Sequence, residues 1–301
     1  MKSVELEQVL AAMRAGALDL SRSPADLRAD FEAMIAAVPI AADATFEPRR
    51  LGPVAALTSR TPGVRDDAAL LYLHGGGYVL GGPREYRGLT AEIGRSAGLQ
   101  VLAIDYRLAP EHPFPAAVDD AVAAYRALLD EGLSPSRIVL AGDSAGGGLA
   151  VAMQVAARDA GLPVPAGAVA ISPWADLSCS GGSMTSKAAE DPSVTRDGLL
   201  RLAGHYLRGT SPGHPLASPV HADLTGLPPL LIQVGSAEIL LDDSTRLAAA
   251  AAAAGVRVRL DAWPDMVHVW HFFAFLLPEA RDAIRQAGDF LRTCLAPGPA
   301  A

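Results

Sequence analysis

The stretch that decides the fold reads Ile138-Val139-Leu140-Ala141-Gly142-Asp143-Ser144-Ala145-Gly146. Its first four residues are apolar and predict a short buried strand, and the proline-free, Ala-rich run over 147–160 predicts a helix. Ser144 is therefore expected at a sharp turn between strand and helix, with its hydroxyl clear of the backbone. Gly142 and Gly146 suit such a turn, because a Cβ at either position would clash with the neighbouring strand and helix. This context makes Ser144 a candidate nucleophile.

Outward from this turn, short apolar runs alternate with helical stretches from about residue 69 onward. The alternation predicts an α/β fold, with a mainly parallel central sheet and helices on both faces. The predicted strands cover 70–73, 101–104, 138–141, 168–171, 230–234 and 256–260, and 45–59 is expected to add antiparallel strands at one edge. The predicted helices between the strands cover 85–96, 116–131, 147–160, 242–254 and 279–293.

Two segments fall outside the alternation. Residues 1–44 contain two helical stretches, 4–15 and 25–37, before the first strand, and residues 178–220 interrupt the sheet with one amphipathic stretch, 196–207. An insertion between two sheet strands usually lies over their carboxyl ends. We therefore expect residues 1–301 to form a single domain with a helical cap built from about 1–44 and about 178–220. The alternative is that both segments only elaborate the surface.

The composition limits the possible partners. The chain of 301 residues is 50% hydrophobic and carries a formal net charge of −8, which argues against binding to nucleic acid phosphates. No apolar run reaches the ~18 residues of a spanning helix, and the acidic residues Glu5 and Glu7 are unlike a signal peptide. A cytoplasmic protein without membrane insertion is expected. Cys179 and Cys294 lack the spacing of a metal site and are expected to be reduced, without an assigned role.

A serine hydroxyl reacts only when a base takes its proton and hydrogen-bond donors stabilise the developing oxyanion. The run His74-Gly75-Gly76-Gly77 follows the predicted strand 70–73, where backbone N–H groups can supply half of an oxyanion hole. The N–H of Ala145, just after Ser144, is the expected donor on the other side, at a helix N-terminus that favours negative charge.

The same glycines could instead hold a dinucleotide cofactor. That reading needs G-x-G-x-x-G, but Leu80 occupies the position of the last glycine and Gly81 comes one residue late. Asp105, which follows a predicted strand as a ribose-binding acid would, opens a loop crowded with charged residues. We therefore expect no cofactor and no metal.

Seven histidines compete for the role of base. His268 follows the last predicted strand and precedes the final helix, which places it after the serine and the candidate acids, in the order Ser, acid, His. His271 is a nearby rival that could equally be a buried or wall residue. His74 is expected to hold the glycine loop by hydrogen bonding. The others, on loops or the expected cap, are expected to be solvated or structural: His112, His205, His214 and His221.

The candidate acid is Glu238, which stands just past the carboxyl end of the predicted strand 230–234. A carboxylate there can meet the base at the same sheet edge as Ser144. Asp242 is the runner-up, and both Asp242 and Asp243 could instead cap the following helix and interact with its dipole. Asp265 is near His268 in sequence, but it could only shape the turn.

Together these residues resemble the hormone-sensitive-lipase-like family of α/β-hydrolase esterases, particularly its bacterial members with a G-D-S-A-G motif. The resemblance covers about residues 69–271 and rests on four ordered motifs: His74 to Gly77, Asp105-Tyr106-Arg107-Leu108-Ala109-Pro110-Glu111, Gly142 to Gly147, and His268. It implies an α/β-hydrolase fold with a cap, Ser144 as nucleophile, His268 as base, and Gly76, Gly77 and Ala145 as oxyanion donors. Gly75 is an alternative to one of the two glycines.

The family usually has aspartate as its acid, and Glu238 departs from that pattern by one methylene. The expected function is a serine carboxylesterase that hydrolyses ester substrates through an acyl-enzyme. The resemblance adds a preference for short acyl chains and, in many members, a homodimer. Tyr78, Trp174 and Tyr206 are candidate substrate-binding residues, although aromatic residues at such positions are as often plain core. The alternatives are an amide or formamide hydrolase, an acetyl-xenobiotic esterase, and a non-catalytic small-ligand receptor, which the presence of His268 argues against.

Overall fold

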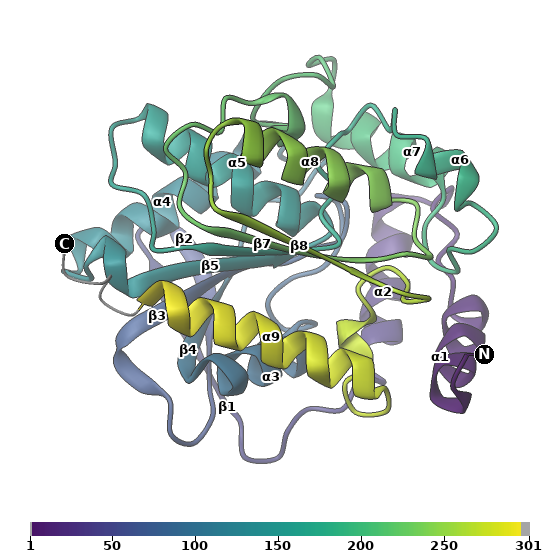
Figure 1. The fold of residues 1–301 in the computed structure, drawn as a ribbon, viewed down its shortest axis with the longest axis horizontal. Helices are drawn as coiled ribbons and strands as arrows, with labels where there is room; N and C mark the ends of the chain where they lie inside the picture. The colour runs from purple at the N-terminus through teal and green to yellow at the C-terminus, as the bar shows by residue number, and fades with distance from the viewer. Residues whose placement is uncertain (1, 296–301) are drawn as a thin grey trace.

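The computed structural model describes residues 2–295, and within them eight strands form one sheet in the order β1-β2-β4-β3-β5-β6-β7-β8 (Figure 1). The pairs β1–β2 and β2–β4 are antiparallel, and every pair from β4 to β8 is parallel. The strands are β1 Thr45–Leu51, β2 Val54–Arg60, β3 Arg65–Leu73, β4 Leu99–Asp105, β5 Ile138–Asp143, β6 Ala168–Ile171, β7 Leu230–Gly235 and β8 Val258–Trp263. The predicted α/β fold and its antiparallel edge are confirmed.

Helices cover both faces of the sheet: α3 and α9 lie on one side, and α4, α5 and α8 lie on the other (Figure 1). The long helices are α1 Val4–Ala15, α2 Pro24–Ile35, α3 Arg87–Ala97, α4 Ala116–Asp130, α5 Ala145–Asp159, α7 Arg196–Leu207, α8 Leu241–Ala253 and α9 Pro278–Leu295. The shorter ones are α6 Ser183–Ser186 and the 3₁₀ turns η1 Pro135–Arg137, η2 Pro219–His221 and η3 Trp270–Phe273. Within residues 2–295, every helix is too short or too polar to cross a bilayer.

The elements differ from the predicted ones mainly at their ends. β3 begins at Arg65 rather than residue 70, because an irregularity between Arg65 and Ala69 lets an exposed segment join the sheet. α5 begins at Ala145, two residues earlier than predicted, because the helix starts directly at the turn and runs through Gly147 and Gly148. All six residues of β5 are buried, as expected for a parallel strand between two helix layers.

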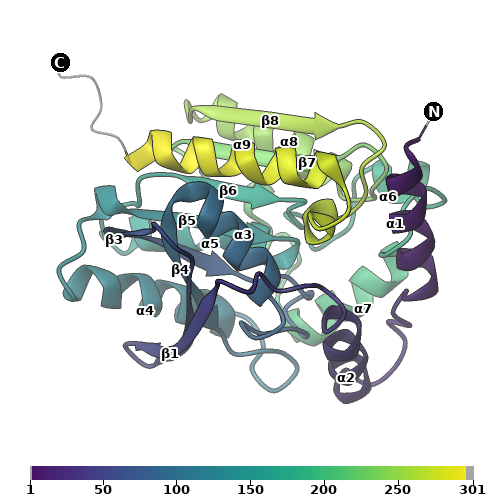
Figure 2. The same cartoon turned by 90° about the horizontal axis from the view of Figure 1, so that it is seen from below.

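The two segments outside the alternation meet at the carboxyl-end side of the sheet. Helices α1 and α2 from the N-terminal segment and α6 and α7 from the insertion gather at this end in both views (Figures 1 and 2). Leu20 packs against Gly198 in α7, and Leu202 of the same helix packs against Gly77. Met1, which the expected cap includes, lies outside the described residues.

Arg28 connects α2 to the loops that follow β3 and β4. Its guanidinium donates to the backbone oxygens of Val79 and Ala109, each at 2.9 Å, and to the carboxylate of Glu111 at 2.6 and 2.9 Å. Val79 lies in the loop after β3, and Ala109 lies in the loop after β4. One side chain therefore connects the N-terminal segment to two loops at the same edge of the sheet.

We expect Arg28→Met to loosen α2. The change keeps much of the apolar stem but removes the donors to two carbonyl oxygens and one carboxylate, which costs about 1–3 kcal/mol. Faster hydrogen exchange of the α2 amides is the measurement. Arg22→Met is the matched control, because Arg22 forms only surface ion pairs with Asp26 and Asp30. Equal exchange in the two variants would contradict the anchoring role.

Candidate active site

Ser144 lies between β5 and α5 in a backbone conformation that non-glycine residues rarely adopt, with φ 54° and ψ −123°. Such a conformation costs about 1–3 kcal/mol and persists only when its surroundings fix it. The Ser144 N–H donates to the oxygen of Ile171 at 2.8 Å, and its carbonyl accepts from the N–H groups of Gly148 and Trp174 at 3.1 and 2.9 Å. The end of β6 with the loop after it, and the first turn of α5, therefore hold the Ser144 turn in place.

Gly142 and Gly146 are required by the packing of this turn. A Cβ on Gly146 would clash with the carbonyl oxygens of Leu73 and His74, at the end of β3. A Cβ on Gly142 would clash with the carbonyl oxygen of Gly146 and lie 2.7 Å from that of Leu73. The turn thus lies directly against the neighbouring strand, as the sequence predicts.

The structure brings Ser144, His268 and Glu238 together in a hydrogen-bonded chain. The His268 Nε2 lies 3.0 Å from the Ser144 Oγ, and its Nδ1 lies 3.2 Å from the Glu238 Oε2. The Gly235 N–H donates to the other Glu238 oxygen at 3.3 Å. The N–H of Val269 donates to the Ser172 Oγ at 3.2 Å, which holds the backbone next to His268. With glutamate in place of the expected aspartate, the Glu238 carboxylate therefore still reaches His268.

Burial and neighbouring charges shift the pKa values of Glu238 and His268 in opposite directions. Burial raises the pKa of Glu238, and its hydrogen bond to His268 opposes the rise only in part. Burial alone would lower the pKa of His268, but the hydrogen bond and charge of Glu238 outweigh it, helped by the charges of Asp191 and Asp143. The net pKa of His268 lies above its ordinary value. The site therefore favours an imidazolium more than water does.

The glycine loop after β3 contains two backbone N–H groups that no acceptor in the described part of the chain uses. Gly76 and Gly77 have φ of 104° and 62°, and the loop closes by hydrogen bonds from Val79 and Leu80 to the Gly76 oxygen at 3.1 and 2.9 Å. Among residues 2–295, the amides of Gly76 and Gly77 have no hydrogen-bond acceptor. Ala145 is the first residue of α5, so its N–H has no partner within the helix.

The alternative donor Gly75 is already engaged, because its N–H donates to the Asp143 Oδ1 at 3.0 Å. Asp143 is buried and also accepts from the hydroxyls of Tyr72 at 2.8 Å and Tyr86 at 3.2 Å. Burial raises its pKa to about 6, although these hydrogen bonds oppose the rise. Asp143 thus joins the Ser144 turn to the glycine loop. This role was not predicted from the sequence, where the only local signal is an acidic residue next to Ser144.

His74 holds the glycine loop, as its position predicts. Its Nδ1 lies 2.8 Å from the Gly75 oxygen, and its ring stacks on Tyr106 with centroids 4.2 Å apart. Burial lowers its pKa to about 4, so the ring is neutral. The rival His271 is buried, and its Nε2 lies 3.0 Å from the Gln233 Oε1. His271 is therefore a buried residue that binds Gln233.

Asp242 and Asp243 do not cap α8, which begins at Leu241, so the capping expectation is wrong. Both lie in the first turn of the helix, where their charges suit its dipole, as expected. The Asp242 carboxylate accepts from the N–H of Ser183 at 3.0 Å, and the Asp243 carboxylate accepts from those of Ala175 and Asp176, both at 2.8 Å. Contacts with distant segments therefore replace the local capping pattern. Asp265 lies in a turn with φ 62°.

The predicted substrate-binding residues Tyr78, Trp174 and Tyr206 form one buried aromatic cluster. The rings of Tyr78 and Tyr206 stack with centroids 3.9 Å apart, and those of Tyr78 and Trp174 are 6.3 Å apart. The cluster lies near the turn, since the backbone N–H of Trp174 donates to the Ser144 carbonyl and Tyr78 follows Gly77. A substrate-binding role for these rings stays a prediction.

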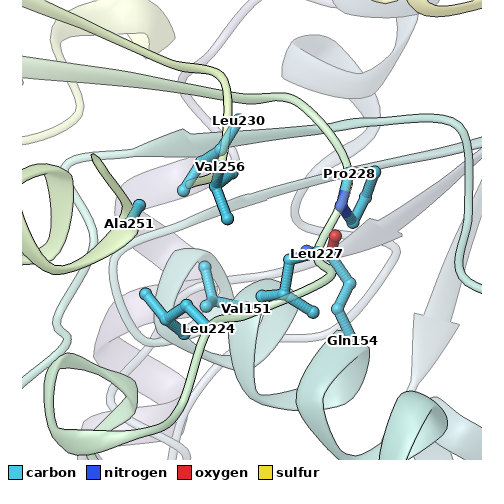
Figure 3. A pocket seen from close by; sticks show the side chains of 8 residues that line it. All are labelled: Val151, Gln154, Leu224, Leu227, Pro228, Leu230, Ala251 and Val256. Carbon is cyan, nitrogen blue, oxygen red and sulfur yellow. The ribbon is translucent and has the colours of Figure 1, made fainter. Parts of the chain in front are cut away.

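A pocket elsewhere among residues 2–295 contains no acidic, basic or nucleophilic side chain. It lies among α5, β7 and α8 and is lined by Val151, Gln154, Leu224, Leu227, Pro228, Leu230, Ala251 and Val256 (Figure 3). None of these residues is titratable. In the part of the chain that the structure describes, no group of three or more His, Cys, Asp and Glu side chains is arranged to hold a metal ion. Cys179 and Cys294 are free thiols.

Comparisons with known proteins agree on the family. A model of the α/β hydrolase fold matches residues 70–272. The chain is 57% identical to an acetyl-hydrolase of Streptomyces hygroscopicus over 79% of each chain. It is also 38% identical to a putative acetyl-hydrolase, LipR, of Mycobacterium tuberculosis, over 94% of this chain and 85% of the relative.

The crystal structure of an esterase from the bacterial hormone-sensitive lipase family is also similar. It is 49% identical in sequence, with a TM-score of 0.96, and the match covers 98% of this chain and 100% of that one. The chain therefore belongs to the hormone-sensitive-lipase family of α/β-hydrolases and is a carboxylic ester hydrolase.

Proposed function

We propose that the protein is a serine esterase that hydrolyses short-chain acyl esters through an acyl-enzyme. The observation that carries this proposal is the hydrogen-bonded chain from Ser144 through His268 to Glu238, with Oγ–Nε2 and Nδ1–Oε2 distances of 3.0 and 3.2 Å. These distances suit proton transfer from a serine hydroxyl to a base that a carboxylate orients.

In the first half of the reaction, the Ser144 Oγ attacks the ester carbonyl while the neutral His268 Nε2 takes its proton. The carbonyl oxygen becomes an oxyanion that accepts from the N–H groups of Gly76, Gly77 and Ala145. Removal of one such donor typically costs about 10²–10³ in kcat. Glu238 stabilises the imidazolium without being protonated itself. The imidazolium then gives its proton to the leaving alcohol, which breaks the ester bond and leaves Ser144 acylated.

In the second half, a water molecule replaces the alcohol. His268 takes a proton from this water as it attacks the acyl carbonyl, and the same N–H groups receive the second oxyanion. When the tetrahedral intermediate collapses, the proton returns to the Ser144 Oγ and the carboxylic acid leaves. The enzyme thus returns to its starting protonation state.

We propose that the N-terminal segment and the insertion form a cap over this site. The proposal is supported by their position at the carboxyl-end side of the sheet and by exposed fractions of only 8% for Ser144 and 9% for His268. The buried rings of Tyr78, Trp174 and Tyr206 suit a wall that limits the acyl chain. Acetyl esters fit this limit, and two relatives are named acetyl-hydrolases. The cytoplasmic location and the homodimer stay predictions.

We expect Ser144→Ala and His268→Ala each to lower kcat for p-nitrophenyl acetate by at least about 10³-fold, because each removes an essential part of one unit. The double variant should be no worse than either single variant. Glu238→Ala should cost about 10²–10⁴-fold, because the base loses its orientation. Steady-state kinetics on variants with unchanged circular dichroism is the measurement.

Asp242→Ala is the control for the acid, since its carboxylate binds the Ser183 backbone and lies outside the proposed chain. We expect a change of only a few fold. Full activity in Ser144→Ala would refute the mechanism. A larger loss from Asp242→Ala than from Glu238→Ala would reassign the acid.

The pH profile follows from the protonation of His268. Only its neutral form accepts the Ser144 proton, so kcat/KM falls as the pH drops through its pKa. The neighbouring carboxylates raise that pKa above its ordinary value of about 6.5. We therefore expect the acid limb, followed by a pH-stat, to be centred above about pH 6.5. A limb centred well below this value would contradict the arrangement of charges.

Acyl-chain preference tests the aromatic wall. We expect kcat/KM to fall from p-nitrophenyl acetate and butyrate to longer esters, and Tyr206→Ala to raise the octanoate-to-acetate ratio by about tenfold. This gain corresponds to burying roughly two more methylenes. Tyr125→Ala is the matched control, because Tyr125 is a buried tyrosine of α4 whose hydroxyl binds the Pro163 oxygen. Equal ratios in the two variants would exclude Tyr206 from the acyl wall.

A further inference from the structure

The insertion places a buried carboxylate beside the proposed active site. Asp191 lies in the loop between α6 and α7 and is 9% exposed. Its Oδ1 accepts from the N–H and Oγ of Ser193, both at 2.9 Å, and from the N–H of Val194 at 3.1 Å. Its Oδ2 accepts from the N–H of Ile239 at 3.0 Å. Both oxygens are therefore occupied by hydrogen-bond donors.

Ile239 directly follows Glu238, and the insertion holds both of its backbone polar groups. Asp191 binds the N–H, and the Ser183 Oγ donates to the carbonyl oxygen at 2.6 Å. The same Ser183 Oγ accepts from the N–H of Asp242 at 3.0 Å. Two side chains of one segment thus fix the turn that carries the acid, although they lie about fifty residues away in sequence.

The charge of Asp191 has no cation beside it in the part of the chain that the structure describes. The nearby Lys187 pairs instead with Glu190 at 3.1 Å. The negative charge therefore acts on the site, where it disfavours ionisation of Glu238 and favours protonation of His268. Besides Asp191, the charged groups that face His268 are Glu238, from the loop after β7, and Asp143, from the end of β5.

We propose that Asp191 is a positioning residue for ester hydrolysis, which fixes the Glu238 turn through Ile239 and favours the imidazolium of His268 by its charge. The proposal rests on the proposed roles of Ser144, His268 and Glu238. Through this role, the position of the insertion on the sheet affects the geometry of Glu238 and His268. When the Asp191 loop is in place, the acid is held and the base is stronger.

The test separates the charge of Asp191 from its hydrogen bond. Asp191→Asn removes the charge and keeps one acceptor oxygen. We expect the plateau of kcat/KM to fall about tenfold, and the acid limb to move to lower pH by roughly half a unit, because the imidazolium loses a neighbouring negative charge. Asp191→Ser, neutral and smaller, should move the limb in the same direction. Asp191→Glu keeps the charge and should retain the wild-type limb.

Two matched variants identify the cause of any effect. Ser183→Ala loosens the same Ile239 peptide without changing the charge, so we expect a lower plateau with an unmoved limb. Asp242→Asn removes one negative charge from the neighbouring turn, and the limb should again stay in place. A limb shift in Asp242→Asn as large as that in Asp191→Asn would overturn the proposal. So would wild-type limbs in both neutral variants of Asp191.

The pKa of His268 is also measured directly, by NMR titration of its imidazole in the Ser144→Ala background. We expect a lower value when Asp191→Asn is added and no change when Asp242→Asn is added. This readout does not depend on catalysis. Retained activity in Ser144→Ala would refute the proposed function, whereas an unchanged His268 pKa would refute the role of Asp191 alone.

Discussion

The turn at Ser144 lies against the end of β3, where the carbonyl oxygens of Leu73 and His74 leave no room for a side chain on Gly146. This close approach holds Ser144 at φ 54° and places its hydroxyl at the edge where β3, β5 and β6 end. The loops after neighbouring strands start from this edge. Glu238 and His268, which lie in the loops after β7 and β8, therefore reach the Ser144 hydroxyl as a hydrogen-bonded series.

Asp143, next to Ser144, connects the turn to the glycine loop through the Gly75 N–H. A buried carboxylate is costly unless its oxygens are hydrogen-bonded, and here two tyrosine hydroxyls and the Gly75 N–H donate to it. The N–H of Gly75 is thereby used by Asp143, and the N–H groups of Gly76 and Gly77 are the ones without an acceptor in the described residues. The Asp143 side chain thus joins the strained turn at Ser144 to the first glycine of the loop.

The parts of the site that follow local rules could be predicted from the sequence. Ser144 is marked by its turn, and Glu238 and His268 each follow a strand in the expected order. Long-range partners have no such signal, because Arg28 binds Val79 across 51 residues and Asp191 binds Ile239 across 48. For Asp242 and Asp243, by contrast, a local signal is present but the capping prediction made from it is wrong. Their position favours a helix cap, but the Asp242 carboxylate binds the insertion and the Asp243 carboxylate binds the loop after β6 instead.

Several features of the site oppose folding on their own. The strained backbone of Ser144 costs about 1–3 kcal/mol, and the buried carboxyl groups of Asp143 and Glu238 lose hydration that their partners replace only in part. The raised pKa of each carboxyl group reflects that loss. A fully packed parallel sheet can hold such groups, because it buries enough apolar surface to offset them. Asp191 and Ser183 of the insertion bind the backbone N–H and carbonyl oxygen of Ile239, next to Glu238. The position of Glu238 therefore depends on contacts from the insertion as well as from the end of β7.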